Sequence, residues 1–201
     1  MPPRGVWGAS AHATWTTAEA WLGRPLEANP SPDEMITRYL AAFGPASAAD
    51  MRAWSGLTGL REVVERLRPR LRAFQDEHGH ELFDLPDAPR PDPDTEAPPR
   101  FLPFYDNVLL SHADRTRIIA KGRGAQLFPA DGLLVGPVLI DGFVGARWKV
   151  AREGGKAILI VEPFGRLRRQ DRAALADDGR RLLLFAAADA RTNEVRLASL
   201  A

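Results

Sequence analysis

The chain has 201 residues, of which 45% are hydrophobic and 26% are charged, and its formal net charge is +1. This composition is that of a soluble globular protein and excludes a largely disordered chain. The sequence contains no cysteine, which excludes disulfides and thiolate metal sites. No apolar run approaches the roughly 20 residues of a membrane span, so a cytoplasmic protein without a membrane segment is expected.

The charges are unevenly distributed along the chain. Residues 31–85 carry 7 basic and 9 acidic side chains, whereas residues 101–201 carry 16 basic and 11 acidic ones. Because a polyanion binds where positive charge is in excess, any nucleic-acid contact is expected in the second half.

Residues 1–30 do not fit the pattern of a complete unit. Residues 6–8 and 13–16 have the composition of strand fragments, and Trp21 and Leu22 are apolar beyond them. No helical pattern precedes these fragments to cover them. We therefore interpret residues 1–30 as the remnant of a domain that begins upstream.

Three short helices are predicted next. Ser31 before a proline is typical of a helix start, and Gly44-Pro45 is expected to end that helix. Ser47 is the predicted cap of a second helix, and a third helix is expected to begin at Thr58. Apolar residues recur at helical spacing in the first and third helices, which predicts one buried face on each.

A β-hairpin and a linker are predicted to follow. Residues 71–75 and 81–85 are strand-like, and Gly79 suits the turn between them. This order predicts that residues 31–85 form a winged helix-turn-helix unit. Residues 86–100 contain six prolines, four acids and no large apolar side chain, and are predicted to be a proline-rich linker.

Residues 101–201 are predicted to form a small C-terminal antiparallel β-barrel with one late helix. A helix is expected at residues 170–187 and a last strand at residues 194–200. Turn signals separate the other strand-like runs, which are 108–110, 117–120, 133–135, 138–140, 143–148 and 157–161. Together with the winged helix, this predicts an α+β fold.

Four stretches, at residues 3–8, 39–47, 102–115 and 141–144, resemble the AlkZ-like family of winged-helix DNA glycosylases. Their order and spacing match, and the stretch Asp-Asn-x-Leu-Leu-Ser-His-x-Asp-Arg within residues 102–115 is the most specific. The resemblance implies tandem winged helices around a C-terminal β-barrel, with DNA in a basic channel. It implies that residues 1–30 are the remnant of an upstream winged-helix domain. It also implies removal of alkylated bases.

The sequence departs from that family at the catalytic motif. The family's catalysis is attributed to a Gln-x-Gln motif in an N-terminal winged-helix region, and here Gln75, Gln126 and Gln170 lie far apart. No catalytic residue can be carried over. We therefore expect a monomeric, cofactor-free chain that binds double-stranded DNA and corresponds to the C-terminal part of the family, with the N-terminal region truncated or lost. The alternative is a non-catalytic interaction or regulatory module, or an inactive truncated gene product.

The candidate DNA contacts are cations of the second half. Alternation along strands would direct Arg115 and Arg117 to one side, and Arg147 and Lys149 to one side, where each pair could grip successive phosphates. The predicted DNA-binding residues are Arg115, Arg117, Lys121, Arg123, Arg147, Lys149, Arg152 and Lys156. A further basic group precedes the late helix, at Arg166, Arg168, Arg169 and Arg172.

The solvent face of the third helix is a weaker candidate for DNA binding. In a winged helix this face enters the major groove. Two glutamates on it would be repelled by phosphates, so a salt-bridged, solvated face is the preferred interpretation. The charged residues of this face are Arg61, Glu62, Glu65, Arg66 and Arg68.

The sequence also suggests two catalytic chemistries. Ser111, His112 and Asp114 could suggest a nucleophilic triad, but neighbours on a strand point to opposite faces. Hydrolysis by Asp106 and Asp114 would require a carboxyl pKa raised by burial. No catalytic residue is assigned.

Two binding roles were also considered. His78 and His80 beside a hairpin tip could bind a metal, but exposed histidines there are more often solvated, so no metal is predicted. Trp148, between two cations, is the tryptophan best placed to stack on a base.

Overall fold

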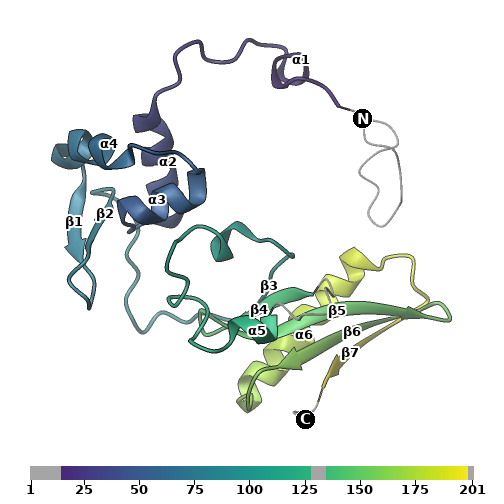
Figure 1. Cartoon of the computed structure of the whole chain (residues 1–201). Coiled ribbons are helices and arrows are strands. Elements are labelled where there is room, and N and C mark those ends of the chain that lie inside the picture. Colours follow the sequence, from purple (N-terminus) through teal and green to yellow (C-terminus); the bar gives the residue numbers. More distant parts are fainter. Residues whose placement is uncertain (1–14, 128–134, 199–201) are drawn as a thin grey trace.

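The computed structural model describes residues 15–127 and 135–198. Figure 1 shows two bodies joined by the proline-rich segment: a helical unit (residues 32–84) and a sheet unit (residues 100–198). Their helices and strands confirm the predicted α+β class. The predictions for residues 1–14, 128–134 and 199–201 lie outside the described residues.

The segment before the helical unit holds one short helix. Trp21 and Leu22, expected beyond strand fragments, belong to α1 (Ala18–Leu22), which Thr17 caps. Figure 1 shows α1 away from both units, at the end of an extended stretch. No helix of the described ranges has the length and apolar character needed to cross a membrane.

The helical unit forms where its capping residues predict. Ser31 caps α2 (Pro32–Phe43), and Ser47 and Asp50 form a capping box on α3 (Ala48–Ser55). The predicted start of the third helix at Thr58 is wrong. Helix α4 (Leu60–Leu67) begins after Gly59, whose φ of 74° is a conformation that glycine adopts readily, and no side chain caps the helix. The short helix η1 (Arg68–Arg70) follows α4.

A two-stranded hairpin completes the helical unit. Strands β1 (Arg72–Gln75) and β2 (Glu81–Asp84) pair antiparallel, as predicted. The core lies between the helices and β2, because the apolar faces of α2 and α4 both turn inward. Its buried side chains include Ile36, Tyr39, Leu40, Met51, Val64, Leu67 and Phe83.

Two predicted strands of the sheet unit are not strands: one is a short helix and the other a turn. Residues 108–110 overlap the helix η2 (Asn107–Leu109), where the Asp106 side chain accepts a hydrogen bond from the backbone of Val108 at 2.9 Å. Residues 117–120 form a turn in which the Arg115 carbonyl accepts from the backbone of Ile119 at 2.7 Å. The apolar side chains of these loop residues pack against the sheet. Their apolar sequence therefore resembled that of strands.

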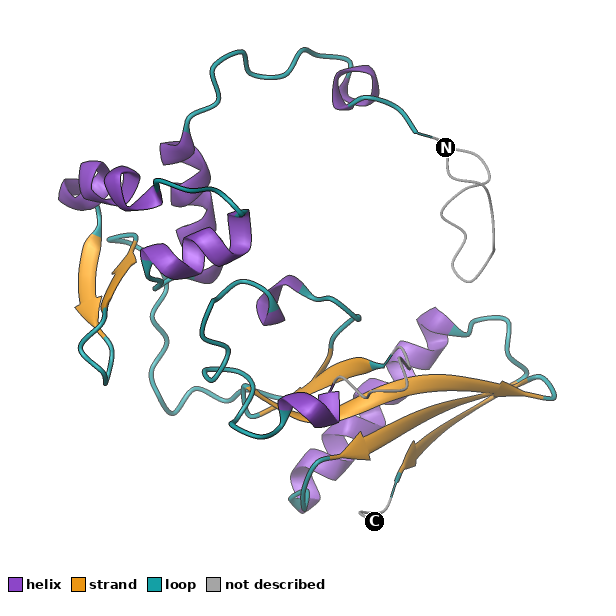
Figure 2. Ribbon diagram, viewed as in Figure 1, coloured by secondary structure: helices purple, strands orange, loops and turns teal. Residues whose placement is uncertain are grey.

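Five strands and one long helix form the body of the sheet unit (Figure 2). The sheet order is β3-β4-β5-β6-β7, and in the described ranges β3 and β7 are its open edges, so the sheet is not a closed barrel. The strands are β3 (Arg100–Phe101), β4 (Gly136–Ile140), β5 (Phe143–Glu153), β6 (Lys156–Pro163) and β7 (Thr192–Leu197).

The prediction of a wholly antiparallel sheet is wrong at one pair. Strands β6 and β7 are parallel, because α6 (Arg169–Ala186) carries the chain back to the same end of the sheet before β7 begins. Gly179 lets α6 lie close to the sheet: a Cβ there would stand 2.8 Å from a methyl carbon of Leu159.

The two faces of the sheet have different covers. One face packs on α6 through side chains that include Val138 and Ala146, and the other packs on residues 108–127 through Leu139 and Val144. A bulge at Gly145 places Val144 and Ala146 on opposite faces although they are two residues apart. The short helix α5 (Gly124–Leu127) therefore lies on the face opposite α6.

Candidate nucleic-acid interface

Arg115 and Arg117 do not form the predicted same-face pair, because they lie in a turn and not on a strand. The Arg117 guanidinium donates to the Pro45 carbonyl at 3.1 Å and to Nε2 of His112 at 2.9 Å. Arg115 lines an apolar cavity and, within the described residues, has no ion pair or side-chain hydrogen bond. Arg117 is therefore a structural residue, whereas the described residues leave the charge of the exposed Arg115 uncompensated.

The residues around Arg117 join the two units. The Tyr39 hydroxyl on α2 donates to the Ser111 carbonyl at 2.6 Å, and Oδ1 of Asp50 on α3 accepts from the backbone N–H of Ala113 at 2.9 Å. We call Tyr39, Asp50, His112 and Arg117 the polar clamp. These contacts fix the position of residues 111–117 against the helical unit.

Burial and hydrogen bonding set the ionisation of the polar clamp. Burial raises the pKa of the Tyr39 hydroxyl, and the nearby Asp50 charge adds to this rise. Burial also favours protonation of the Asp50 carboxyl, but hydrogen bonds from Ser47 and Ala113 outweigh it, and the pKa falls below its ordinary value. Asp50 is therefore an anion and Tyr39 a neutral donor.

His112 cannot serve as a base for Ser111. The expectation that the two side chains point apart is wrong, since Ser111 Oγ lies 2.9 Å from His112 Nδ1. Arginine can only donate, so the Arg117 contact makes Nε2 the acceptor and places the imidazole proton on Nδ1. The imidazole therefore donates to Ser111, and the serine is fully buried. This geometry rejects the triad for a reason that the sequence did not give.

The prediction that Arg147 and Lys149 point the same way is confirmed. Both reach the carboxylate of Glu162 on β6, Arg147 at 2.5 Å and Lys149 at 3.5 Å. They lie on the sheet face opposite α6, and a single carboxylate between two cations leaves a net positive charge there.

The other two predicted cations of this hairpin are paired. Arg152 bonds to Asp189 at 2.8 Å and to the carbonyl of Ala186 at 3.2 Å. Lys156 forms an ion pair with Glu194. Neither cation is as free as its sequence position suggests.

A chain of contacts links Arg147 to the loop around α5. Arg147 Nη1 donates to the carbonyl of Gln126 at 3.2 Å, and Arg123 donates to Oε1 of the same glutamine at 3.0 Å. Arg123 also donates to the Phe164 carbonyl. Arg123 and Arg166 line one groove of about 400 Å³, and Lys121 follows directly on another lining residue, Ala120.

We call Lys121, Arg123, Arg147, Lys149 and Arg166 the basic tract. Glu162 is the one carboxylate paired with any of them in the described ranges. Lys121 and Arg166 are exposed and have no ion pair or side-chain hydrogen bond there. The tract thus carries several charges that no described residue neutralises.

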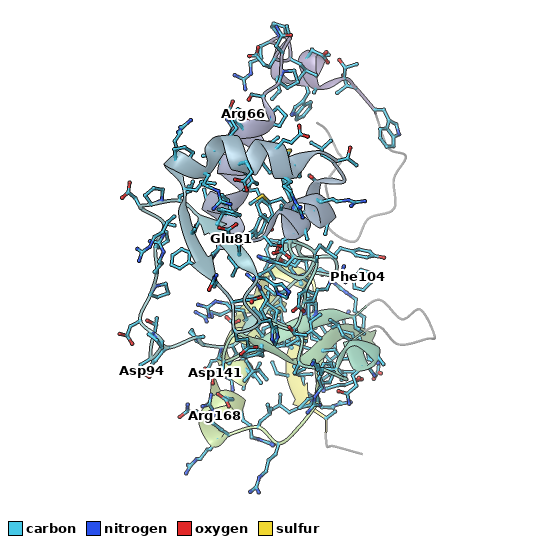
Figure 3. The ribbon with its side chains drawn as sticks, turned by 60° about the vertical axis from the view of Figure 1, so that its left-hand side comes forward. Arg66, Glu81, Asp94, Phe104, Asp141 and Arg168 are labelled. Carbon is cyan, nitrogen blue, oxygen red and sulfur yellow. The ribbon has the colours of Figure 1, made fainter. Side chains whose placement is uncertain are left out.

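Acidic residues at the end of the groove are already compensated. Arg168 binds the buried carboxylate of Asp171 through two nitrogens, at 2.7 and 3.1 Å, and lies 3.8 Å from Asp141. Figure 3 shows Asp141 beside Arg168, and Phe104 well away from both in that view. Arg169 and Arg172, on the first turn of α6, are exposed beyond this pair.

The solvent face of α4 is crossed by ion pairs, as expected for a salt-bridged face. Arg66 pairs with Asp33, and Arg68 pairs with Glu65 at 2.7 Å and with Glu81 at 2.6 Å. Arg66 and Glu81 are labelled in Figure 3. These carboxylates compensate Arg66 and Arg68, whereas Arg61 has no ion pair among the described residues.

The carboxylates considered for hydrolysis are engaged in turns. Asp114 accepts from the backbone of Thr116 at 2.8 Å and has no ion pair with Arg115 or Arg117 among the described residues. This hydrogen bond lowers the pKa of Asp114, the opposite of the rise that a general acid needs. Asp106 is held in the same way by Val108.

The remaining candidates also have internal partners. His80 Nδ1 lies 2.9 Å from Asp76, and the described part of the chain has no group of three side chains placed to hold a metal ion. The indole N–H of Trp148 donates to the Leu102 carbonyl at 2.9 Å, and its ring packs edge-on against Phe101. Trp148 is therefore a packing residue and not a free stacking platform.

The family model and the similar solved structure both point to AlkZ. Among solved structures, the DNA glycosylase AlkZ of Streptomyces sahachiroi is similar, with a TM-score of 0.69 and 23% identity over 90% of this chain and 50% of that one. The likeness shows a shared fold, and this chain spans half the length of AlkZ. No curated protein matches the chain. The family model described as DNA glycosylase AlkZ-like matches residues 1–185, and the chain therefore belongs to the AlkZ-like DNA glycosylase family.

Proposed function

We propose that this chain binds duplex DNA through its phosphates, along the basic tract. The observation that carries the proposal is the continuous line of cations from Lys149 through Arg147 and Arg123 to Lys121, with Arg166 across the groove and one carboxylate among them. Phosphate contacts of this kind are indifferent to sequence and sensitive to salt.

The roles within the tract differ. Arg123 and Arg147 are tied to backbone carbonyls and position the loop around α5. Lys121, Lys149 and Arg166 are the cations with the weakest protein partners, so they are the proposed phosphate ligands. The predicted ligands Arg117, Arg152 and Lys156 are assigned to structural contacts instead.

The helical unit is proposed to be a winged helix that does not dock through its α4 face. Three helices and an antiparallel hairpin follow the order of that motif. The ion pairs of Arg66 and Arg68 with carboxylates reduce the positive charge that groove insertion needs. Through the polar clamp, this unit would position the loop that leads to the basic tract.

Base excision by this chain alone is not part of the proposal. The three glutamines of the sequence form no Gln-x-Gln motif, and the described acids near the tract are paired or hold turns. The check is incubation with an alkylated duplex followed by alkaline cleavage at abasic sites. Strand breaks above the protein-free level would contradict this assignment.

The test of DNA binding is fluorescence anisotropy with a duplex of about 20 base pairs, titrated at several salt concentrations. Three phosphate contacts predict a log–log salt slope of about −3. In the triple variant Lys121→Ala, Lys149→Ala and Arg166→Ala, the slope should approach zero.

The matched control removes three cations outside the tract, with Arg38→Ala, Arg180→Ala and Arg181→Ala. Each of these arginines is exposed and pairs with a carboxylate on its own helix, so the net charge changes equally. Equal losses of affinity in both triple variants would reject the tract. A folded wild-type chain that binds no duplex at low salt would reject DNA binding and favour a protein-interaction module.

A further inference from the structure

An apolar cavity lies beside the polar clamp and outside the basic tract. Its volume is about 290 Å³, close to the roughly 300 Å³ at which small-molecule sites begin. Leu109 and Leu127 form its buried wall. The described residues that line it are Phe104, Tyr105, Leu109, Leu110, Arg115, Leu127, Val135 and Pro137.

Tyr105 at the edge of this cavity has a strained backbone. Its φ is 64°, a conformation that costs a residue with a side chain of order 1 kcal/mol or more. The cost is not repaid by burial, since the Tyr105 side chain is 68% exposed. Its ring meets Phe104 edge-on at 4.1 Å between centroids. An exposed ring held by a strained backbone indicates a surface shaped for a ligand.

Arg115 supplies the polar group of the cavity. It is exposed and, in the part of the chain described, has no ion pair or side-chain hydrogen bond. An apolar slot with an aromatic edge suits a flat ring, and a free guanidinium beside it suits a phosphate. A nucleotide combines both groups.

We propose that this cavity receives one unstacked nucleobase of a DNA strand, with Tyr105 stacking on the base and Arg115 binding its phosphate. The inference rests on the proposed function, because the strand must first be held by the protein. The cavity volume of about 290 Å³ is large enough for one base. Its described lining has no carboxylate or amide, so the site holds a base and does not cleave its glycosidic bond.

The stretch between Tyr105 and Arg115 is anchored to both units. Residues 111–113 are fixed to the helical unit by the polar clamp, and Leu109 is fixed in the core beneath the sheet face. Tyr105 and Arg115 stand at the two ends of this anchored stretch. The two ligand groups are therefore presented by a rigid segment, which lowers the ordering cost of binding.

The test compares two duplexes that differ by a single unpaired adenine. Stacking on an aromatic side chain contributes about 1–3 kcal/mol per base, so the wild-type chain should bind the bulged duplex about 10-fold more tightly than the paired one. Tyr105→Gly removes the ring and relieves the positive φ, so the variant should fold. It should bind both duplexes with the affinity of the wild type for the paired one, whereas Tyr105→Phe should keep the preference.

The possible outcomes distinguish a failure of the nucleobase site from a failure of DNA binding. A wild-type chain that binds both duplexes equally would overturn the nucleobase site and leave phosphate binding intact. An undiminished preference in Tyr105→Gly would overturn the site as well. No binding of either duplex would overturn both proposals. If deoxyadenosine monophosphate bound as tightly as the bulged duplex, the occupant would be a free nucleotide and the assignment to DNA would be wrong.

Discussion

The guanidinium of Arg117 donates to Nε2 of His112 at 2.9 Å, and this contact holds the imidazole neutral. Burial lowers the pKa of His112, and the positive charge of Arg117 lowers it further, while Asp50 opposes both. The histidine is thus a neutral connector between a cation and the hydroxyl of Ser111. The junction between the two units depends on its staying neutral.

The stability of the protein is therefore expected to fall as the pH drops below about 6.5, the ordinary pKa of histidine. The unfolded chain takes up a proton on His112 near that pH, whereas the folded chain takes it up only at lower pH. Between the two, the unfolded state binds more protons, so acid lowers the free energy of unfolding. Urea titrations between pH 7.5 and about 5.5 measure this slope.

His112→Gln removes the titrating group and places a neutral side-chain amide at the junction. Its free energy of unfolding should be lower than that of the wild type at pH 7.5 but should depend less on pH. Equal slopes in the two proteins would show that His112 does not titrate between the folded and unfolded states.

Asp50 is expected to contribute more to the free energy of unfolding than an ordinary helix cap does. Asp50→Ala removes the acceptor for Ser47 and also the acceptor for the backbone of Ala113, which then has no partner at the junction. The free energy of unfolding should fall by about 3 kcal/mol. Ser47→Ala tests the cap alone and should cost about 1 kcal/mol. Equal losses in chemical denaturation would mean that the contact with Ala113 contributes nothing.

The elements predicted correctly from the sequence are those whose signals are local. Ser31 and Ser47 mark helix starts because a capping hydroxyl acts within three residues of itself. Alternation placed Arg147 and Lys149 on one face because side chains on a strand alternate whatever the strand pairs with.

The errors concern contacts between distant residues. Val108 and Ile118 look like strand residues because they are apolar, but loops bury them against the sheet. The parallel pairing of β7 depends on where α6 returns the chain. The compensation of Arg147 by Glu162 depends on the register of β5 against β6, which no short stretch contains.

The candidate site shows the same division. Its cations could be named from the sequence, but which of them are free could not. Arg117 is used by Pro45, 72 residues earlier in the chain, and Asp50 reaches Ala113, 63 residues later. A capping residue with a second partner gives no signal beyond the cap itself, so the polar clamp was missed.

Close packing of α6 on the sheet predicts a cost for a single methyl group. In Gly179→Ala the new Cβ would lie 2.8 Å from a methyl carbon of Leu159 and 3.2 Å from those of Val195. Strain should exceed the gain in helix propensity and lower the free energy of unfolding by about 1–2 kcal/mol. Gly124→Ala meets nothing within 4 Å and is the control. A thermal melt of Gly179→Ala at or above the wild-type temperature would show that α6 can move away from the sheet.

A substitution at Trp148 distinguishes a packing role of the indole from base stacking. Trp148→Phe removes the hydrogen bond to Leu102 and leaves an aromatic ring beside Phe101. The free energy of unfolding should fall by about 1 kcal/mol, because the Leu102 carbonyl loses its indole donor. Affinity for the paired duplex should stay the same, because the indole ring packs inside the unit. Urea denaturation and anisotropy titration of the same preparation measure both quantities. A loss of affinity near 10-fold without a loss of stability would instead assign the indole to DNA stacking.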